Sequence, residues 1–265
     1  KSQAGTKNAR YQDGYFYYEN MHNTDRVLGY LERSFDSYQL HGKHVLPSLN
    51  KMVINWMGAY TDMTQEEPDL RFFENLYEMN NGDPTNYMLK TNTTPARFYR
   101  DMSEYNIHNK LDIELPVNIF GSDSKFKFGG EYSYKFRNLN NTRFALTYNM
   151  TDFPLGDPEY YLNNYIIKSS RPLGYYYTND QNNDLNNSYR AEEEVFAAYG
   201  MLDLNFSENW RMVAGARIEN SYINTENKVN EEASTYKSGE LEETDILPSL
   251  NVKYTVQEDM NLRLA

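Results

Sequence analysis

Residues 210–222, WRMVAGARIENSY, alternate between two kinds of side chain with a period of two. Successive side chains of a β-strand point to opposite faces, so this segment predicts a strand with one apolar face and one charged face. At roughly 3.3 Å per residue and a tilt of about 45°, such a strand spans about 28 Å, which is close to the apolar thickness of a membrane. Each face takes every second residue, and we call such a set of alternate residues a parity. The apolar parity consists of Trp210, Met212, Ala214, Ala216, Ile218, Asn220 and Tyr222.

The same alternation recurs in other parts of the chain. The segments that carry it are 52–60, 107–117, 126–136, 196–206, 250–256 and 260–264. Two earlier segments, 11–18 and 27–40, have the aromatic and β-branched composition of strands but alternate less regularly. The sequence therefore predicts about eight or nine strands.

The connections between these segments alternate between short and long. Three of them are short, at 118–124, 207–209 and 257–259, and three are long, at 61–97, 138–190 and 224–242. In an antiparallel meander this order places the short links on one rim and the long ones on the other, as in bacterial outer-membrane barrels with short periplasmic turns and long extracellular loops. A soluble β-sandwich also has wet faces but has less reason to sort its loops in this way. We therefore predict an all-β, antiparallel, up-and-down transmembrane barrel.

The two parities predict an orientation for each side chain in such a barrel. The residues expected to face lipid are Trp56, Phe128, Tyr134, Leu204, Met212 and Val252. The residues expected to face the lumen are Lys127, Glu131, Arg211, Arg217 and Lys253.

Composition excludes several classes of protein. No apolar run of the 265 residues approaches the roughly 20 that a transmembrane helix needs, and the absence of cysteine excludes disulfides and thiolate sites. A net charge of −12 argues against nucleic acid as a partner. No catalytic or phosphate-binding motif is present, so neither an enzyme nor a cofactor is expected. A metal at His41 and His44, or Ca²⁺ at the acidic segment 240–245, is less favoured than a periplasmic turn and a solvated strand end respectively.

Several segments together resemble the barrel of TonB-dependent outer-membrane receptors. They are AAYGM at 197–201, AGARIE at 214–219, LPSLNVKY at 247–254 and MNLRL at 260–264, with earlier support from 32–34, 38–40 and 65–71. The pair formed by the G-x-R-x-E strand and the L-P-S-L-N strand is more specific than either motif alone. The abundance of Tyr and Asn resembles Bacteroidetes members of the family.

The resemblance implies nutrient uptake across the outer membrane, driven by the TonB–ExbB–ExbD complex acting on a plug domain. The family closes its barrel with 22 strands, whereas this chain contains no plug-like region and its last strand stops at Ala265. We therefore expect all 265 residues to belong to one barrel domain of a longer protein, with a surface lipoprotein as a further possible partner.

Aromatic side chains in the long intervals are the candidate ligand contacts, because tyrosine offers a flat apolar face and a polar tip. They are Tyr160, Tyr161, Tyr175, Tyr176, Tyr177, Phe72 and Phe73. Acidic loops oppose an anionic ferric siderophore, so a glycan or a peptide is the favoured substrate. Two other functions stay open: a non-transporting barrel, such as an adhesin or an assembly factor, and a soluble β-rich glycan-binding module.

Overall fold

The computed structural model describes the chain except for residues 90–94, 120, 149–174, 180–186, 228–236 and 258. The described residues form one antiparallel sheet with a single short 3-10 turn, Pro47–Leu49. No helix in this part of the chain has the length and apolarity needed to cross a bilayer. The strands are β1 (Ser2–Phe16), β2 (Met21–Leu46), β3 (Met52–Asn80), β4 (Asp83–Leu89), β5 (Ala96–Ile119), β6 (Ser122–Tyr148), β7 (Tyr175–Asn179), β8 (Tyr189–Asn205), β9 (Trp210–Asn227), β10 (Lys237–Gln257) and β11 (Met260–Leu264).

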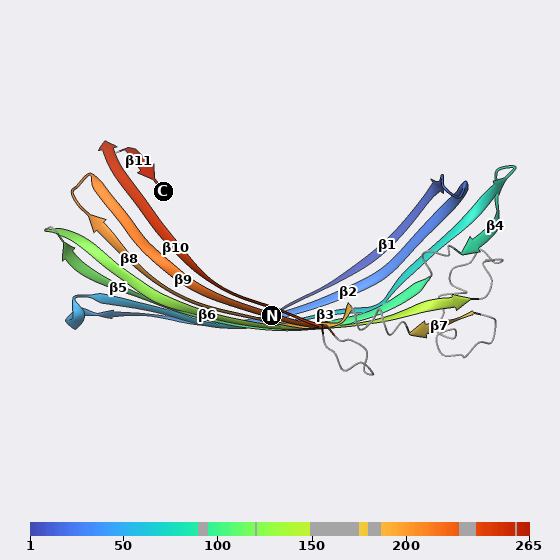
Figure 1. The fold of residues 1–265 in the computed structure, drawn as a ribbon, viewed down its shortest axis with the longest axis horizontal. Coiled ribbons are helices and arrows are strands. Elements are labelled where there is room, and N and C mark those ends of the chain that lie inside the picture. Colours follow the sequence, from blue (N-terminus) through green and yellow to red (C-terminus); the bar gives the residue numbers. More distant parts are fainter. Residues whose placement is uncertain (90–94, 120, 149–174, 180–186, 228–236, 258) are drawn as a thin grey trace.

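Nine of the described strands follow one another across the sheet in chain order. The path is β1-β2-β3-β5-β6-β8-β9-β10-β11, while β4 pairs with the end of β3 and β7 with the end of β6. Figure 1 shows the sheet as a curved, open surface with β1 and β11 at its two ends. The predicted antiparallel meander of eight or nine strands is confirmed.

The register places each apolar parity on a common face of the sheet. Trp56 lies opposite Leu111, Leu111 opposite Gly130, Gly130 opposite Ala198, and Ala198 opposite Ile218. Directly paired residues share a face, so these five lie on one side, which we call the apolar face. The other side, the charged face, carries the opposite parity of each strand.

The strands are much longer than the alternating segments predict. The interval 61–97, predicted as a long connection, contains the second half of β3, all of β4 and the start of β5. In the same way β6 continues to Tyr148, β9 continues to Asn227, and β10 begins at Lys237. The prediction of long loops at these places is wrong over these residues, because strand pairing continues where the apolar parity ends.

The turns differ in length between the two rims, with one exception. The short connections β5–β6, β8–β9 and β10–β11 share a rim, and β4 and β7 lie at the opposite rim (Figure 1). Gly121, at φ 77°, supplies the left-handed residue of the tight β5–β6 turn. The β1–β2 connection at 17–20 is short although it lies on the rim of the long connections. His41 and His44 lie within β2, so their prediction as a turn is wrong.

A single sheet leaves large apolar side chains exposed on the apolar face. Phe196 is 60% exposed, Ile246 71% and Leu250 52%. The closest packing lies at the rim of β4, where the buried apolar residues are Met21, Val27, Phe73, Leu76, Tyr77, Leu89 and Ala96. A second layer or a surrounding apolar medium is needed to cover the rest of this face.

Candidate functional site

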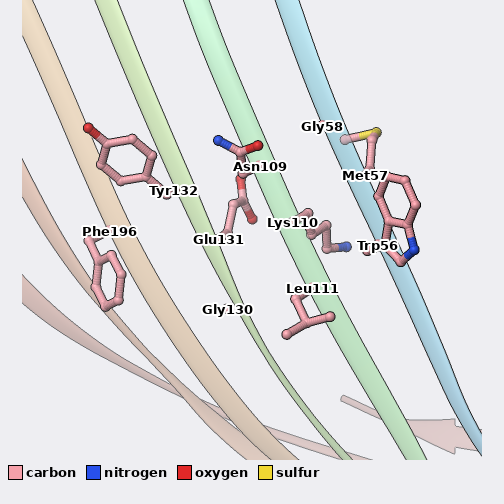
Figure 2. A pocket seen from close by; sticks show the side chains of 10 residues that line it. All are labelled: Trp56, Met57, Gly58, Asn109, Lys110, Leu111, Gly130, Glu131, Tyr132 and Phe196. Atoms are coloured by element: carbon pink, nitrogen blue, oxygen red, sulfur yellow. The ribbon is translucent and has the colours of Figure 1, made fainter. Parts of the chain in front are cut away.

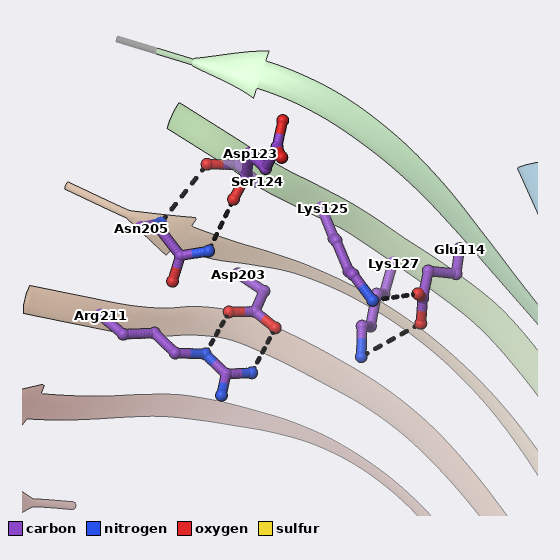
Figure 3. Close-up of polar contacts among 8 residues, drawn as sticks. All are labelled: Glu114, Asp123, Ser124, Lys125, Lys127, Asp203, Asn205 and Arg211. Carbon is purple, nitrogen blue, oxygen red and sulfur yellow. Dashed lines mark hydrogen bonds and ion pairs between the residues drawn. The ribbon is translucent and has the colours of Figure 1, made fainter. Parts of the chain in front are cut away.

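Ion pairs between neighbouring strands lie on the charged face beside the rim of short turns. The Glu114 carboxylate lies 2.6 Å from Lys125 Nζ and 3.3 Å from Lys127 Nζ. Arg211 donates two hydrogen bonds to Asp203, from Nε at 2.7 Å and from Nη2 at 2.6 Å (Figure 3). A bidentate arginine–carboxylate pair fixes both distance and orientation, so β8 and β9 are held in register here.

Asn205 braces the end of β8 against the start of β6 at the same rim. Its side-chain amide donates to the carbonyl oxygen of Asp123 at 2.6 Å, and its backbone N–H donates to Ser124 Oγ at 3.4 Å (Figure 3). Hydrogen bonds from the side chain and backbone of one residue satisfy groups that the ladder leaves open at the strand end.

The middle of the charged face holds a second polar cluster. Glu131 lies between Arg217 and His108, with Oε2 3.2 Å from Arg217 Nη1 and Oε1 3.8 Å from His108 Nδ1. Beside it, the Tyr199 hydroxyl donates to Asp112 at 2.6 Å. The partners come from β5, β6, β8 and β9, so the polar contacts cross four strands of the wall.

Further pairs extend this pattern towards the opposite rim. Lys135 Nζ lies 3.1 Å from Glu193, and Arg137 Nε donates to Glu104 at 2.5 Å. The charged face is therefore an ion-paired surface along β5 and β6. It offers no arrangement of nucleophile and base, and the described residues include no group of three or more His, Cys, Asp or Glu that could hold a metal.

Phe98, near the start of β5, has two cations and another aromatic ring around it on the charged face. The Phe72 ring packs edge-on against it at a centroid distance of 5.5 Å. The guanidinium carbon of Arg100 lies 4.8 Å from the Phe98 centroid, and that of Arg143 lies 5.7 Å away. We call these four residues the arginine–phenylalanine cluster. Such distances are typical of cation–π contacts.

A bulge in β3 is held by a half-buried ion pair. Asp69 has a left-handed φ of 82°, and the pairing of β3 with β5 shifts register around it. Arg97 donates to the Asp69 carboxylate from Nε and Nη2, both at 2.5 Å, and Arg71 Nε donates at 2.8 Å. Burial of Asp69 raises its pKa, but the hydrogen bonds from Arg97 and Arg71 outweigh burial and hold the pKa below its usual value. Arg97 is only 1% exposed, so its guanidinium is shielded from water, whereas the Asp69 side chain is 19% exposed.

Aromatic residues pack around Tyr77 near the tip of β3. Its hydroxyl donates to Asp13 at 2.9 Å, and its ring stacks on His22 at 5.2 Å and meets Tyr87 at 5.7 Å. Burial, followed by the hydrogen bond to the Asp13 carboxylate, raises the pKa of Tyr77 to about 12. These contacts tie the ends of β1, β2, β3 and β4 together beyond the apolar band.

The apolar face is hollowed where glycines replace larger side chains. A shallow groove of about 410 Å³ passes Gly58 and Gly130, with Trp56 and Leu111 on one side and Phe196 on the other (Figure 2). Its full lining is Trp56, Met57, Gly58, Asn109, Lys110, Leu111, Gly130, Glu131, Tyr132 and Phe196. Most of the lining residues belong to the apolar parity, while Met57, Lys110 and Glu131 belong to the parity of the charged face.

The register divides the predicted orientation residues between the two faces. Trp56, Phe128, Tyr134, Leu204, Met212 and Val252 share the apolar face, and Lys127, Glu131, Arg211, Arg217 and Lys253 share the charged face. That the first face meets lipid and the second the lumen stays a prediction, because pairing alone does not place the sheet in a membrane.

The predicted ligand-contact aromatics lie apart in the structure. Phe72 and Phe73 lie in β3 and not in a loop, and Phe73 is only 1% exposed. The tyrosines at 175–177 lie in β7, paired with β6. Tyr160 and Tyr161 lie outside the described residues, and ligand contact by any of these side chains stays a prediction.

Sequence reasoning missed the Asp69 clamp and the arginine–phenylalanine cluster. The Asp69 clamp lies in the interval 61–97, which was interpreted as a long connection. The cluster combines residues of that interval and of 138–190 with Phe98 and Arg100, which were assigned to no strand. The sequence does contain a signal that β5 begins earlier than predicted. Phe98, Arg100 and Met102 lie at every second position before Glu104 and so belong to the same face of the strand. The pairing of that parity with Asn141 and Arg143 of β6 needs the register and could not be predicted from one strand.

Comparison with known proteins gives one family and several solved structures. The family model described as TonB dependent receptor-like, beta-barrel matches residues 3–265. No curated protein matches. Among solved structures, the siderophore receptor PiuA from Acinetobacter baumannii is 9% identical to this chain, with a TM-score of 0.39. The alignment covers 97% of this chain and 47% of the PiuA chain. The ferric-catecholate import receptor Fiu from E. coli K12 is 10% identical, with a TM-score of 0.39 and coverage of 98% and 45%. The ferric citrate transporter FecA is 13% identical, with a TM-score of 0.37 and coverage of 98% and 40%. The chain thus spans less than half the length of these proteins.

Proposed function

Because this chain belongs to the TonB dependent receptor-like β-barrel family, we propose that it forms part of the wall of an outer-membrane barrel that imports a nutrient. Members of the family are outer-membrane transporters and not enzymes. The chain's role is then to separate lipid from an aqueous lumen and to contribute side chains to the path of the substrate.

The opposed faces of the sheet are the observation that supports this proposal most directly. Large apolar residues such as Phe196 and Ile246 are exposed on one face, while ion pairs such as Arg211–Asp203 line the other. In water the first face would be an extended apolar patch, whereas in a bilayer it is covered by lipid. We assign the apolar face to lipid and the charged face to the lumen.

The energy for uptake would come from the TonB–ExbB–ExbD complex through a plug domain, and a surface lipoprotein is a further candidate partner. Neither contact is assigned to residues of this chain.

A glycan or a peptide is proposed as the substrate in preference to a ferric siderophore. The net charge of −12 opposes the approach of a strongly anionic complex. Tyr160, Tyr161 and the tyrosines at 175–177 are the proposed contacts, because their rings and hydroxyls suit sugar rings and peptide groups.

Growth under substrate limitation tests the proposal. Cells that lack the receptor are grown on a panel of oligosaccharides and peptides, each as the limiting nutrient, beside cells that lack TonB. We expect both strains to fail to grow on the same substrate, and we expect growth on it to return when the receptor gene is restored. If growth on every substrate is unchanged by loss of the receptor, the import function is wrong. If the receptor mutant still grows poorly when the substrate enters the cell by a route that does not need TonB, the barrel has a role other than transport.

A further inference from the structure

We infer that the groove on the apolar face is a lipid-binding site whose occupant is phosphatidylethanolamine, a lipid with ester-linked acyl chains and a primary ammonium group. This rests on the proposed function, because it needs the apolar face to meet lipid. The groove holds one acyl chain, the side-chain amide of Asn109 binds an ester carbonyl oxygen, and the carboxylate of Glu194 binds the ammonium group.

The groove drawn in Figure 2 continues past Gly58 towards β2. A second hollow of about 400 Å³ lies beside it, and the two share Gly58 and Asn109, so together they reach from β2 to β8. At Gly58 the hollow takes the place of one missing side chain between Trp56 and Tyr60. A space one side chain wide admits a chain of methylene groups, whereas a helix is about 10 Å across and would rest on the flanking rings.

Asn109 is a polar residue on the apolar face. It is exposed, and no residue of the described chain forms a hydrogen bond with its side chain. Its Oδ1 lies 3.3 Å from the place that a Cβ on Gly58 would occupy, so the amide borders the hollow. Directly paired residues form rows across the sheet, and Asn220 of the same row instead donates to Thr244 Oγ1 at 2.9 Å. An amide that meets lipid without a partner is costly, so we expect a lipid group to accept its hydrogen bond.

The next row towards the long connections marks the edge of the apolar band. It consists of Tyr60, Ile107, Tyr134, Glu194, Tyr222 and Glu242, and so contains two carboxylates. Asn109 lies one row inside this edge, which is about 5 Å at the usual rise and tilt of barrel strands. The ester groups of a phospholipid lie at the border between hydrocarbon and headgroups, and this is the depth of Asn109.

Glu194 gives the groove a preference for a cationic headgroup. Its Oε1 accepts a hydrogen bond from the Tyr132 hydroxyl at 2.9 Å, and Tyr132 lines the groove directly opposite Asn109. The Glu194 side chain is exposed, and no cation of the described chain pairs with it. A carboxylate at the edge of hydrocarbon is costly unless it is paired, and an ammonium group supplies the pair. Hollow, amide and carboxylate thus follow the order of acyl chain, ester and ammonium in the lipid.

Native mass spectrometry of bound lipids tests the inference. The purified receptor, as expressed in cells, is stripped of its own lipids in detergent and mixed with equal amounts of phosphatidylethanolamine and phosphatidylglycerol that carry the same acyl chains. We expect the wild type to bind phosphatidylethanolamine in preference. Glu194→Gln should lower this preference about tenfold, because the ammonium group loses a charged acceptor. Glu242→Gln removes the same charge from the same row outside the groove and should leave the preference unchanged.

Two further variants test the hollow and the amide. Asn109→Leu should lower the binding of both lipids about fivefold, because both carry the ester carbonyl groups that the amide binds. Asn220→Leu is its control from the same row and should leave the binding of both lipids unchanged. Gly58→Leu fills the hollow and should abolish the binding of both.

Equal binding of the two lipids by the wild type overturns the inference, as does an equal loss of preference in Glu194→Gln and Glu242→Gln. A polypeptide that copurifies with the wild type and is lost in Gly58→Leu would make the groove a seat for a protein partner, and this also overturns it. If the lipid preference is absent while TonB-dependent growth on a substrate persists, this inference fails and the import function stands. If that growth is also absent, both fail.

Discussion

Asp69 combines a backbone conformation and a charge that few residues supply together. Its left-handed φ of 82° suits Asp, Asn or Gly, while its carboxylate neutralises the almost fully buried guanidinium of Arg97. Loss of one partner of a buried pair leaves the other uncompensated, and this costs more than the pair itself contributes. The clamp therefore fixes the path of β3 beyond the apolar band.

Asp69→Asn should remove the charge and keep the backbone preference. We expect the free energy of local opening around β3 and β5 to fall by about 1–3 kcal/mol at neutral pH, because Arg97 loses a charged acceptor. Hydrogen exchange of amides at 66–73 and 96–100 measures this. Unchanged protection in the variant would show that the bulge does not depend on the ion pair.

The clamp also predicts an acid dependence. The pKa of Asp69 is lowered in the folded protein, so its stabilisation is complete above the ordinary value of 3.8 and is lost as pH falls through the lower folded pKa. Protection of β3 in the wild type should therefore stay constant from neutral pH to about pH 4 and decline below it. In Asp69→Asn this decline should be absent. A loss of protection near pH 6 in the wild type would assign the effect to another group.

Neighbouring positions on β9 should respond oppositely to a new charge. Met212→Arg places a cation on the apolar face and should lower the free energy of unfolding in lipid vesicles by about 2–4 kcal/mol. Val213→Arg places the same cation on the charged face opposite Asp203 and should cost less than about 1 kcal/mol. Urea unfolding of both variants decides between the faces. Equal costs would contradict the assignment.

Among the elements, the nine strands of the main path could be predicted from the sequence, whereas their lengths and the short strands β4 and β7 could not. Within the apolar band the contrast between parities is large, as in Trp210, Met212 and Ile218 against Arg211 and Arg217. Further along β3 both parities become polar, as in Thr64, Gln65 and Glu66, so the period-two signal vanishes although the pairing continues. Backbone hydrogen bonds hold these extensions, and such bonds leave no trace in hydropathy.

The same limit applied to the candidate site. The residues of the charged face within the band follow from alternation, because one parity of a strand determines the other. The arginine–phenylalanine cluster needs β3, β5 and β6 in register, and three strands cannot be aligned from composition alone.

Two glycines in adjacent strands test the close pairing of β6 with its neighbours. A Cβ on Gly129 would lie 2.3 Å from the Leu111 carbonyl oxygen, whereas a Cβ on Gly200 would meet nothing within 4 Å. Gly129→Ala should therefore lower the free energy of unfolding by about 1–3 kcal/mol, because the backbone of β5 must move. Gly200→Ala should be neutral or stabilising by up to about 1 kcal/mol. Thermal unfolding in detergent measures both, and equal stability of the two variants would mean that the β5–β6 register differs from the one described.

On the scale of the whole molecule, the curved sheet separates two rims as well as two faces. The β8–β9 turn at 206–209 lies at the rim of short turns, and the β1–β2 turn at 17–20 lies at the other (Figure 1). In an outer-membrane barrel these rims face the periplasm and the cell exterior respectively.

Single cysteines test this polarity, and residues 1–265 contain no cysteine that would compete for the label. Glu19→Cys should be labelled on intact cells by a polyethylene-glycol maleimide that does not cross the outer membrane. Glu208→Cys should be labelled only after the outer membrane is opened. The reverse pattern would invert the proposed topology.

The assignment of one face to lipid and the other to water is tested most directly by spin labels along β9. A nitroxide is placed in turn at positions 211, 212, 213 and 214 of the receptor in lipid vesicles, and its collision rates with oxygen and with a water-soluble nickel chelate are measured. We expect labels at 212 and 214 to favour oxygen and labels at 211 and 213 to favour the nickel chelate, with a period of two. Equal access of the nickel chelate to all four positions would contradict the account, because both faces of the strand would then lie in water.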